Sequence, residues 1–489
     1  MTGDRDEDRG ELLDAMDWLL TRFEGDDSVA YAEVAGVYRE KTDAVITDDG
    51  PRNVTAFPET GVWCRVFADG AADYRYTTSL NEESLEDVAA RAIRGGEFLA
   101  QDDPARFDAY TTHRAVHGGW ADEPIHSVDA ESKVEAVGEA LAATDDLALD
   151  RVWVNYADEH AEVTLGTTTG STVKTTLDRA SVTFSLTPEE GPKVSRHAGS
   201  TRGAAFLDRL PAVFEDAAAD VRSLSAAEPT DSPTGETTVA LSPEAAGQLF
   251  HHASHQLEAD ARYMGMSPHS VGDRIGPDGL DIEDTVHAGS WDALAFDAEV
   301  RPATPVQLVE SGEVARLLHN TASAAEDETY PAGNAVPSLG LDQPPRIHAR
   351  HLEVAPGDAT PGELRESADV YVERFGTPRL RDEFERAQRE GEMPPSVLYA
   401  RDVAEKMPEG EDRWCADLPV AEAYRLDGEE RAGRVEGVTL DYGPETLRNV
   451  ARLGAVRATV TGVCEKHKSR LPYAVTAPGL RLRAALREK

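Results

Sequence analysis

Three side chains that can bind a metal lie within one short segment, LSPEAAGQLFHHASHQLEAD. If this segment is helical, at 100° per residue His251, His255 and Glu258 lie within about 60° of each other on one face, whereas His252 points elsewhere. Two imidazoles four residues apart rise from adjacent turns, and a carboxylate three residues further along can join them around one cation. The spacing therefore points to a metal site, although three histidines in five residues also fit a solvated helix face.

The cysteines are few and are judged one by one. Cys64, Cys415 and Cys464 include no CxxC pair, which argues against a disulfide framework. Cys464 ends the strand-like run VRATVTGVC, where a cysteine is commonly a small buried apolar residue. As a thiolate, the same residue is a zinc ligand.

Two acids form a second candidate group. Asp297 and Glu299 in FDAEV stand at i and i+2, so in a strand they face the same side as paired carboxylates. Half-exposed acids are equally expected in a chain this acidic. Lys466 and His467, which follow Cys464, read as loop residues.

The segment that carries the histidines has a strong helix-start signal. Ser242 is a favourable N-cap and Pro243 is tolerated at the first helical position, which predicts a helix over 242–259. Its apolar stripe comprises Ala246, Leu249, Phe250, Ala253 and Leu257.

The rest of the chain predicts an α+β protein. The first half combines antiparallel strands, read from period-2 segments such as TGVWCRVFADG, with helices in an α/β-type domain. Helices are predicted over 11–23, 83–98, 127–144 and 204–223. The second half is predicted to be mostly β. It carries the predicted helix 242–259 and a further short helix in ETLRNVARLG.

Composition shifts suggest where the domains divide. Residues 225–237, SAAEPTDSPTGET, are rich in Pro, Ser, Thr and acid and read as a linker. We therefore expect one region over 1–224 and a carboxy-terminal domain over 238–489. The polar stretch 376–413 reads as a surface excursion.

Composition also limits the function. The 489 residues include 91 acidic and 49 basic side chains, a net charge of −42 that disfavours nucleic acid as a partner. The acidic residues are spread along the chain, which is typical of a protein adapted to high salt. At molar ionic strength the repulsion between them is screened within about 3 Å. No apolar run approaches the roughly 20 residues of a membrane helix, and the start MTGDRDEDRG does not resemble a secretory signal, so we expect a cytoplasmic protein.

Five blocks of the second half, in order, resemble the TldD/PmbA family of metalloprotease-like proteins. They are LSPEAAGQLFHHASHQLEAD, MGMSPHSVGDRIG, FDAEVRPATPVQLVESGEV, AGNAV and GVCEKHKSRLP. Active members of this family carry an HExxxH motif, one residue and then Leu-Glu-x-Asp, with a cysteine near the carboxyl end completing a zinc site. The resemblance implies peptide hydrolysis inside an enclosed dimer.

The resemblance fixes a register that departs from the motif. Matching His255 and Glu258 to the end of the block places Phe250 at the first ligand position and His251 at the catalytic glutamate. His255 and Cys464 match the two remaining ligands. A phenyl ring cannot bind zinc, and an imidazole serves less well as the proton acceptor beside an attacking water once it is itself a ligand.

Two interpretations follow. In the first, His251 replaces the missing ligand, so that His251, His255 and Cys464 hold zinc with an open fourth position, and Glu258, Asp297 or Glu299 acts near the water. The chain is then a cytosolic zinc-dependent peptidase that acts on unfolded or leader-type peptides, as a homodimer or a heterodimer. In the second, it is a non-catalytic PmbA-like subunit that shapes a chamber together with a paralogue carrying an intact HExxxH motif.

Overall fold

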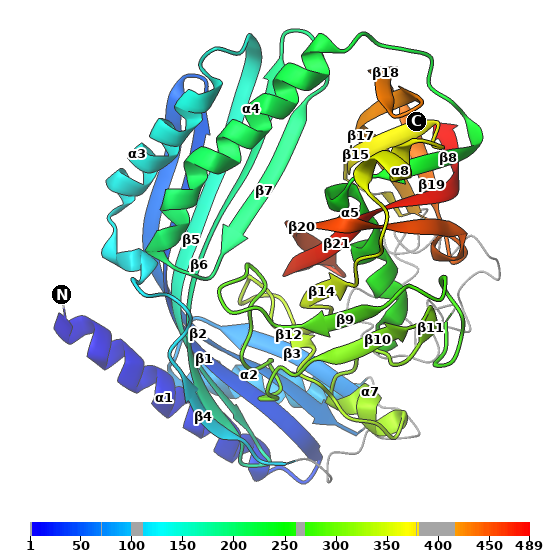
Figure 1. The fold of residues 1–489 in the computed structure, drawn as a ribbon. Helices are drawn as coiled ribbons and strands as arrows, with labels where there is room; N and C mark the ends of the chain where they lie inside the picture. The colour runs from blue at the N-terminus through cyan, green and yellow to red at the C-terminus, as the bar shows by residue number, and fades with distance from the viewer. Residues whose placement is uncertain (1, 70, 99–110, 261–268, 378, 381–415) are drawn as a thin grey trace.

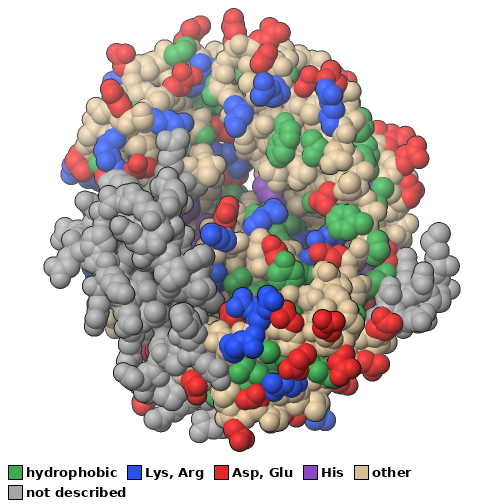
Figure 2. Space-filling model, turned by 180° about the vertical axis from the view of Figure 1, so that it is seen from behind, with side chains coloured by type: hydrophobic (Ala, Val, Ile, Leu, Met, Phe, Trp, Pro, Cys, Tyr) green, Lys and Arg blue, Asp and Glu red, His purple; other side chains and the backbone are tan. Residues whose placement is uncertain are grey.

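The computed structural model describes residues 2–69, 71–98, 111–260, 269–377, 379–380 and 416–489 and has two β-rich halves that face each other (Figure 1). Both halves combine helices with mainly antiparallel strands, which confirms the predicted α+β class. None of the helices in these ranges is long and apolar enough to cross a membrane. Acidic side chains are spread over the described parts of the face in Figure 2.

The described part of the amino-terminal half forms one seven-stranded sheet of order β3-β2-β1-β5-β6-β4, with β7 also paired to β6. Its pairs are antiparallel except β4 with β6. The strands are β1 (Val29–Thr47), β2 (Gly50–Ala68), β3 (Ala71–Thr77), β4 (Arg114–His117), β5 (Leu149–Thr167), β6 (Thr172–Pro188) and β7 (Val194–Ser200). At about 3.3 Å per residue, the longest strands extend about 60 Å.

Four helices of the described residues cover this sheet in two pairs, each with its own apolar core. They are α1 (Thr2–Glu24), α2 (Glu82–Phe98), α3 (Ala130–Leu141) and α4 (Leu210–Ala226), with 3₁₀ turns η1 (Ile125–Ser127), η2 (Ala142–Thr144) and η3 (Ala204–Arg209). The first pair packs on β1 and β2 and the second packs on β5 and β6. The ring of Phe184 from β6, for example, lies 4.4 Å from that of Phe214 on α4, centroid to centroid. Each of the four helices overlaps a predicted one, but α1 begins nine residues before the predicted start at 11, and the predicted start at 204 is the 3₁₀ turn η3 rather than α4.

The described part of the carboxy-terminal half is built on a twelve-stranded sheet that closes on itself. Strand β8 pairs with both β15 and β21, so the path β21-β19-β17-β15-β8 returns to its start. Its strands are β8 (Gly235–Leu241), β9 (Ile282–Thr285), β10 (Val306–Glu310), β11 (Glu313–Val314), β14 (His351–Val354), β15 (Val370–Phe375), β16 (Arg379–Leu380), β17 (Ala416–Asp427), β18 (Glu430–Arg434), β19 (Val438–Tyr442), β20 (Val450–Lys466) and β21 (Ser469–Glu488). A separate pair consists of β12 (Ala335–Val336) and β13 (Arg346–Ile347).

The helical elements among the described residues of this half are short. They are α5 (Pro243–Ser254), η4 (His255–Leu257), α7 (Thr321–Glu326), α8 (Pro361–Arg365) and η6 (Leu447–Asn449). The predicted helix in ETLRNVARLG is wrong. Only η6 forms there, because from Val450 onward the chain pairs as β20 with β21.

Between the halves, α4 ends at Ala226 and β8 begins at Gly235, so the predicted linker 225–237 overlaps both elements. The division into domains remains a prediction. Of the predicted excursion, residues 378 and 381–413 lie outside the described residues, as does Cys415.

Buried contacts tie the two halves together. Arg65 on β2 donates to Glu33 on β1 at 2.8 Å and also to Glu299 of the second half. The ring of Trp291 packs on Gly199 of β7, where a Cβ atom would approach it to 2.5 Å, and its indole N–H donates to Gly462 O on β20 at 2.8 Å. These contacts bring the inner face of the amino-terminal sheet next to β20, which carries Cys464.

Candidate metal centre

Helix α5 begins as predicted but ends early. The Ser242 hydroxyl accepts the N–H of Ala245 at 3.0 Å, and Pro243 is the first helical residue. The α-helix stops at Ser254, whereas the sequence predicted residue 259. It stops there because the next residues pair with a distant segment. Leu318 N–H donates to Leu257 O at 2.9 Å.

The early end changes how the predicted face is formed. His251 lies on α5 and His255 opens η4, so these two rings still rise from adjacent turns, with centroids 4.8 Å apart. Glu258 has extended backbone angles, φ −92° and ψ 129°. It therefore reaches the histidines from beyond the helix rather than from the same helical face.

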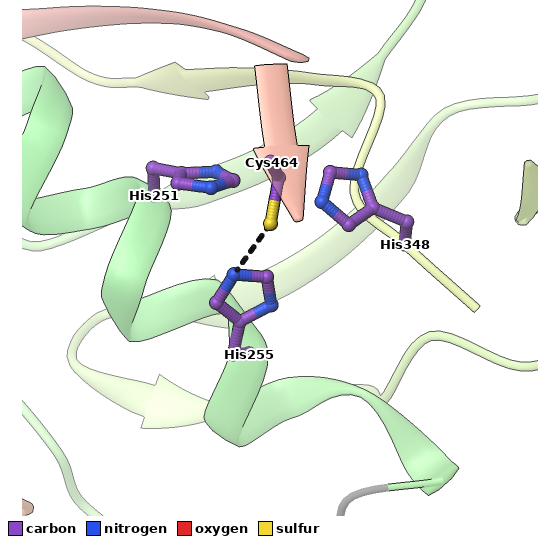
Figure 3. Close-up of side chains that lie close together, drawn as sticks. All are labelled: His251, His255, His348 and Cys464. Atoms are coloured by element: carbon purple, nitrogen blue, oxygen red, sulfur yellow. Dashed lines mark hydrogen bonds between the residues drawn. The ribbon is translucent and has the colours of Figure 1, made fainter. Parts of the chain in front are cut away.

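Four side chains converge at this point, as Figure 3 shows, with three imidazoles around one thiol. One donor atom from each of His251, His255, His348 and Cys464 lies within 4.8 Å of the others. His348 comes from the segment between β13 and β14, and Cys464 comes from β20. Cys464 Sγ lies 3.4 Å from His255 Nε2.

The chemistry and spacing of these donors fit zinc. Bond lengths of about 2.0–2.1 Å to nitrogen and 2.3 Å to sulfur place tetrahedral ligands about 3.3–3.7 Å apart. The separation of 3.4 Å between Cys464 and His255 falls in that range. His348 is fully buried, and neither of its ring nitrogens has a hydrogen-bond partner, which is costly unless a cation satisfies one of them. His348 also stands at the fourth position that the sequence left open.

A carboxylate orients His255 from behind. His255 Nδ1 lies 3.1 Å from Glu258 Oε2 and 3.2 Å from Oε1, in the arrangement by which metal-binding histidines are commonly held. We assign a proton to Nδ1, since a carboxylate accepts it there, and Nε2 faces Cys464 Sγ. Glu258 thus supports a ligand, and the role near an attacking water predicted for it finds no support in these contacts.

Lys466 connects this carboxylate to the rest of the centre. Its Nζ donates to Glu258 at 2.6 Å, to Asp260 at 2.8 Å and to Ile347 O at 2.7 Å. Ile347 directly precedes His348. The sequence reading of Lys466 as a loop residue is wrong, because its side chain is buried and joins β20 to the two other segments that carry the donors.

The two closest donors form a charged pair. Burial opposes the charged form of His255, but the charges of Glu258 and Cys464 outweigh it and raise its pKa to about 10. Burial would likewise raise the pKa of the Cys464 thiol, but the charge of His255 outweighs it and lowers the pKa to about 6. At neutral pH Cys464 is therefore a thiolate, the form that binds metal.

The other imidazoles are held neutral. Burial, together with His255 and His252, keeps the pKa of His251 well below its usual value, and its ring stacks on Tyr473 at 3.6 Å between centroids. A neutral ring offers the lone pair that a metal needs. Burial lowers the pKa of His252 to about 3, and His252 is not one of the four converging residues, as the sequence predicted.

Asp297 and Glu299 are placed differently from the prediction. They lie in a tight turn rather than a strand, and Asp297 Oδ1 accepts the N–H groups of Glu299 and Arg301, both at 2.9 Å. Burial, and then the charge of Glu299, raise the pKa of Asp297 to about 7. Glu299 itself binds Arg65 and accepts the N–H of Thr321 at 2.6 Å. Neither acid belongs to the four-residue group.

His348 was missed in the sequence because nothing in its spacing relates it to α5 or to Cys464. One signal is present in its own segment, RIHARHLEV. Arg346, His348 and Arg350 alternate along it, and all three are buried. Alternating polar side chains are typical of the solvent-facing side of a strand, so this pattern alone does not distinguish a buried row from an exposed one.

Comparisons with known proteins identify the family of this chain. Models of the PmbA/TldA metallopeptidase family match residues 32–95 as domain 1 and residues 234–379 as the C-terminal domain. A protein of Methanothermobacter thermautotrophicus described as a metalloprotease is 24% identical over 472 residues, covering 94% of this chain and 96% of its own. The chain belongs to the TldD/PmbA family. A metalloprotease of Synechocystis is 27% identical to this TldD/PmbA chain over 323 residues, 63% of this chain and 67% of its own.

Solved structures of similar proteins share the TldD/PmbA fold. A proposed modulator of a DNA gyrase from Thermotoga maritima has a TM-score of 0.72 at 17% identity, with 97% of this chain and 99% of that chain covered. TldE from Thermococcus kodakarensis has a TM-score of 0.66 at 13% identity, covering 96% and 99%. At these identities the likeness shows the fold alone.

Within the TldD/PmbA family, this chain has an altered motif. Phe250, at the position of the first ligand, is 1% exposed and packs in the main apolar core. In the register that the resemblance implies, His251 stands in place of the motif glutamate, while His255 and Cys464 match the remaining ligands. The chain is therefore a metallopeptidase-like member of the TldD/PmbA family.

Proposed function

We propose that this metallopeptidase-like protein binds zinc through His251, His255, His348 and Cys464 and serves mainly as a metal-holding subunit of a peptide-processing TldD/PmbA assembly. The observation that supports this most is the convergence of four donor atoms within 4.8 Å, three from imidazoles and one from a thiolate. Four protein ligands are typical of closed, structural zinc sites, whereas catalytic sites keep one position open. Zinc, when bound, would supply Lewis-acid polarisation and folding energy.

The surrounding residues support a structural role. Peptide hydrolysis needs a proton acceptor beside the attacking water. The carboxylate of Glu258 is already bound to His255 Nδ1 at 3.1 Å and to Lys466 Nζ at 2.6 Å. At the position of the motif glutamate the chain has His251. In this proposal the chain forms a dimer with a paralogue that carries an intact HExxxH motif. The cytoplasmic location remains a prediction.

A second candidate is hydrolysis of unfolded or leader-type peptides by this chain alone. One observation favours it. Glu258 anchors His255 and Tyr473 stacks on His251, whereas the ring nitrogens of His348 have no hydrogen-bond partner. His348 is thus the donor held least firmly, and its withdrawal would open a position beside the remaining three.

Metal content tests the shared part of both candidates. Protein purified without added metal is measured for zinc by mass spectrometry, next to Cys464→Ser, His255→Ala and a His252→Ala control. We expect one zinc equivalent to disappear in the first two variants and to persist in the control. Equal zinc in all four proteins, or none in the unaltered chain, would overturn the proposal.

Cleavage of an unfolded protein such as casein separates the two candidates. The subunit proposal expects no cleavage by the chain alone and cleavage after it is mixed with an HExxxH paralogue that is weakly active by itself. Cleavage by the chain alone that Cys464→Ser abolishes and His348→Ala preserves would reject the subunit role in favour of hydrolysis. Failure to form any complex with the paralogue would also count against the subunit role.

A further inference from the structure

A second group of metal-binding side chains lies in the amino-terminal half, outside the centre described above. It comprises His126 on η1, His160 on β5 and Asp178 on β6, and one donor atom of each lies within 4.8 Å of the others. The three residues are far apart in the sequence. The TldD/PmbA motif includes none of them.

The sheet and one 3₁₀ turn bring this group together. His160 and Asp178 are directly opposite each other in the antiparallel β5–β6 register, so their side chains project from the same face. The N–H of Ile125 donates to Asp178 Oδ1 at 2.9 Å, and Ile125 is fully buried. The next residue, His126, is thereby held with its ring 4.0 Å from that of His160, centroid to centroid.

The donor set differs in kind from the first centre. Two imidazoles and one carboxylate form a facial triad that suits divalent first-row transition cations and leaves positions open for solvent. Bonds of about 2.0–2.2 Å place adjacent ligands of an octahedral ion about 2.8–3.1 Å apart. His160 Nδ1 lies 2.8 Å from Asp178 Oδ1, shorter than the 3.4 Å between His255 and Cys464.

The local charge also favours a cation. Glu162 Oε1 lies 3.8 Å from His160 Nε2, so two carboxylates flank the His160 ring, and Arg9, which binds Glu162, offsets only one of them. Asp178 is 2% exposed, and a carboxylate buried this deeply needs compensation. His126 is only half-buried, which gives a cation access from solvent.

We propose that His126, His160 and Asp178 form a second metal site, which takes a divalent first-row transition cation with solvent completing an octahedral shell. This site is independent of the zinc centre. Without a cation, the proton of a His160–Asp178 hydrogen bond occupies the same place. A purely structural hydrogen bond is therefore the alternative that the experiment must detect.

Titration of the full metal-free chain with Co²⁺ tests the proposal. We expect two equivalents to bind, one with the intense absorption of a tetrahedral thiolate site and one with the weak absorption of a six-coordinate site. In Cys464→Ser only the weak absorption should remain. Asp178→Asn, which keeps the side-chain shape, and His126→Ala should each weaken binding of the second equivalent at least tenfold, whereas His113→Ala, outside both groups, should not.

Two results would overturn it. One is a single equivalent in the unaltered chain that Cys464→Ser abolishes. The other is cobalt binding by Asp178→Asn and His126→Ala that equals that of the unaltered chain. Far-ultraviolet circular dichroism of each variant shows that a lost equivalent is not a lost fold.

Discussion

Replacing Lys466 with methionine should destabilise the protein severely, because the ammonium group is the shared partner of buried groups around the metal centre. Its Nζ contacts Glu258 at 2.6 Å, Asp260 at 2.8 Å and Ile347 O at 2.7 Å. Methionine fills a similar space but donates no hydrogen bond. Two carboxylates are then left without their cation in a region where the lysine side chain is only 9% exposed.

The expected cost follows from this burial. Removing one partner of a buried ion pair costs about 3–5 kcal/mol, since the remaining charge stays desolvated. With a urea dependence of about 1–3 kcal/mol per molar, the unfolding midpoint should fall by about 1 M or more. An exposed ion pair would change it by far less.

The destabilisation by Lys466→Met depends on pH, and the pKa of Glu258 sets the direction of this dependence. Burial opposes ionisation of Glu258, but the charge of Lys466, and then that of His255, keep its pKa below the usual value. A lowered pKa stabilises the fold above the unfolded value of about 4.3, and this stability is lost as the pH falls through the folded pKa. In Lys466→Met the pKa of Glu258 rises, so the variant should lose most stability near neutrality and less in acid, where the carboxylates take up protons.

At alkaline pH the difference in stability between Lys466→Met and the unaltered protein should also become smaller. Asp260 and Glu258 outweigh burial and raise the pKa of Lys466, so its contribution is present below the unfolded value of about 10.4 and is lost as the pH rises through the folded pKa.

Urea unfolding of chelator-treated protein, followed by tryptophan fluorescence at pH 5 and pH 7.5, measures the size of the destabilisation and its change toward acid. The matched control is Lys468→Met, because Lys468 lies on the same hairpin and is exposed. A midpoint for Lys466→Met equal to that of the control would refute the reasoning. So would a deficit that grows toward acid.

Three further predictions concern the same centre. Glu258→Gln should weaken zinc binding about 10–100-fold in competition with a chromophoric chelator, because it loosens the hold on His255; unchanged affinity would contradict that role. Phe250→Ala should cost about 3–5 kcal/mol in thermal unfolding through a core cavity while zinc is retained, and loss of zinc with an intact fold would place the ring in the site instead. In metal-free protein, alkylation of Cys464 should accelerate as the pH rises through about 6, and zinc should protect it. Cys64, whose pKa burial raises to about 12, should stay unreactive, and acceleration only above pH 8 would argue against a thiolate at Cys464.

The features that could be predicted from the sequence are those set by nearby residues. The start of α5 follows from Ser242 and Pro243, and the helices of the first half follow from apolar periodicity. The end of α5 could not be predicted, because Leu257 leaves the helix to pair with Leu318. The helix expected near residue 450 failed for the same reason, since β21 supplies a partner that local propensity does not contain.

The residues of the candidate site also differ in whether the sequence could predict them. His251 and His255 could be related by helical spacing, and Cys464 by family resemblance. His348 could not be found, because only the tertiary fold brings the segment between β13 and β14 to α5. The placement of Asp297 and Glu299 failed because a strand was assumed where the backbone turns.

X-ray absorption at the zinc edge tests the four-ligand centre most directly. It is best recorded on Asp178→Asn, so that the amino-terminal group does not contribute to the signal. We predict three nitrogen ligands at about 2.0–2.1 Å and one sulfur at about 2.3 Å, with the sulfur signal lost in a further Cys464→Ser change. Zinc without a sulfur ligand, or a protein that retains no zinc, would contradict the proposal that His251, His255, His348 and Cys464 hold the metal.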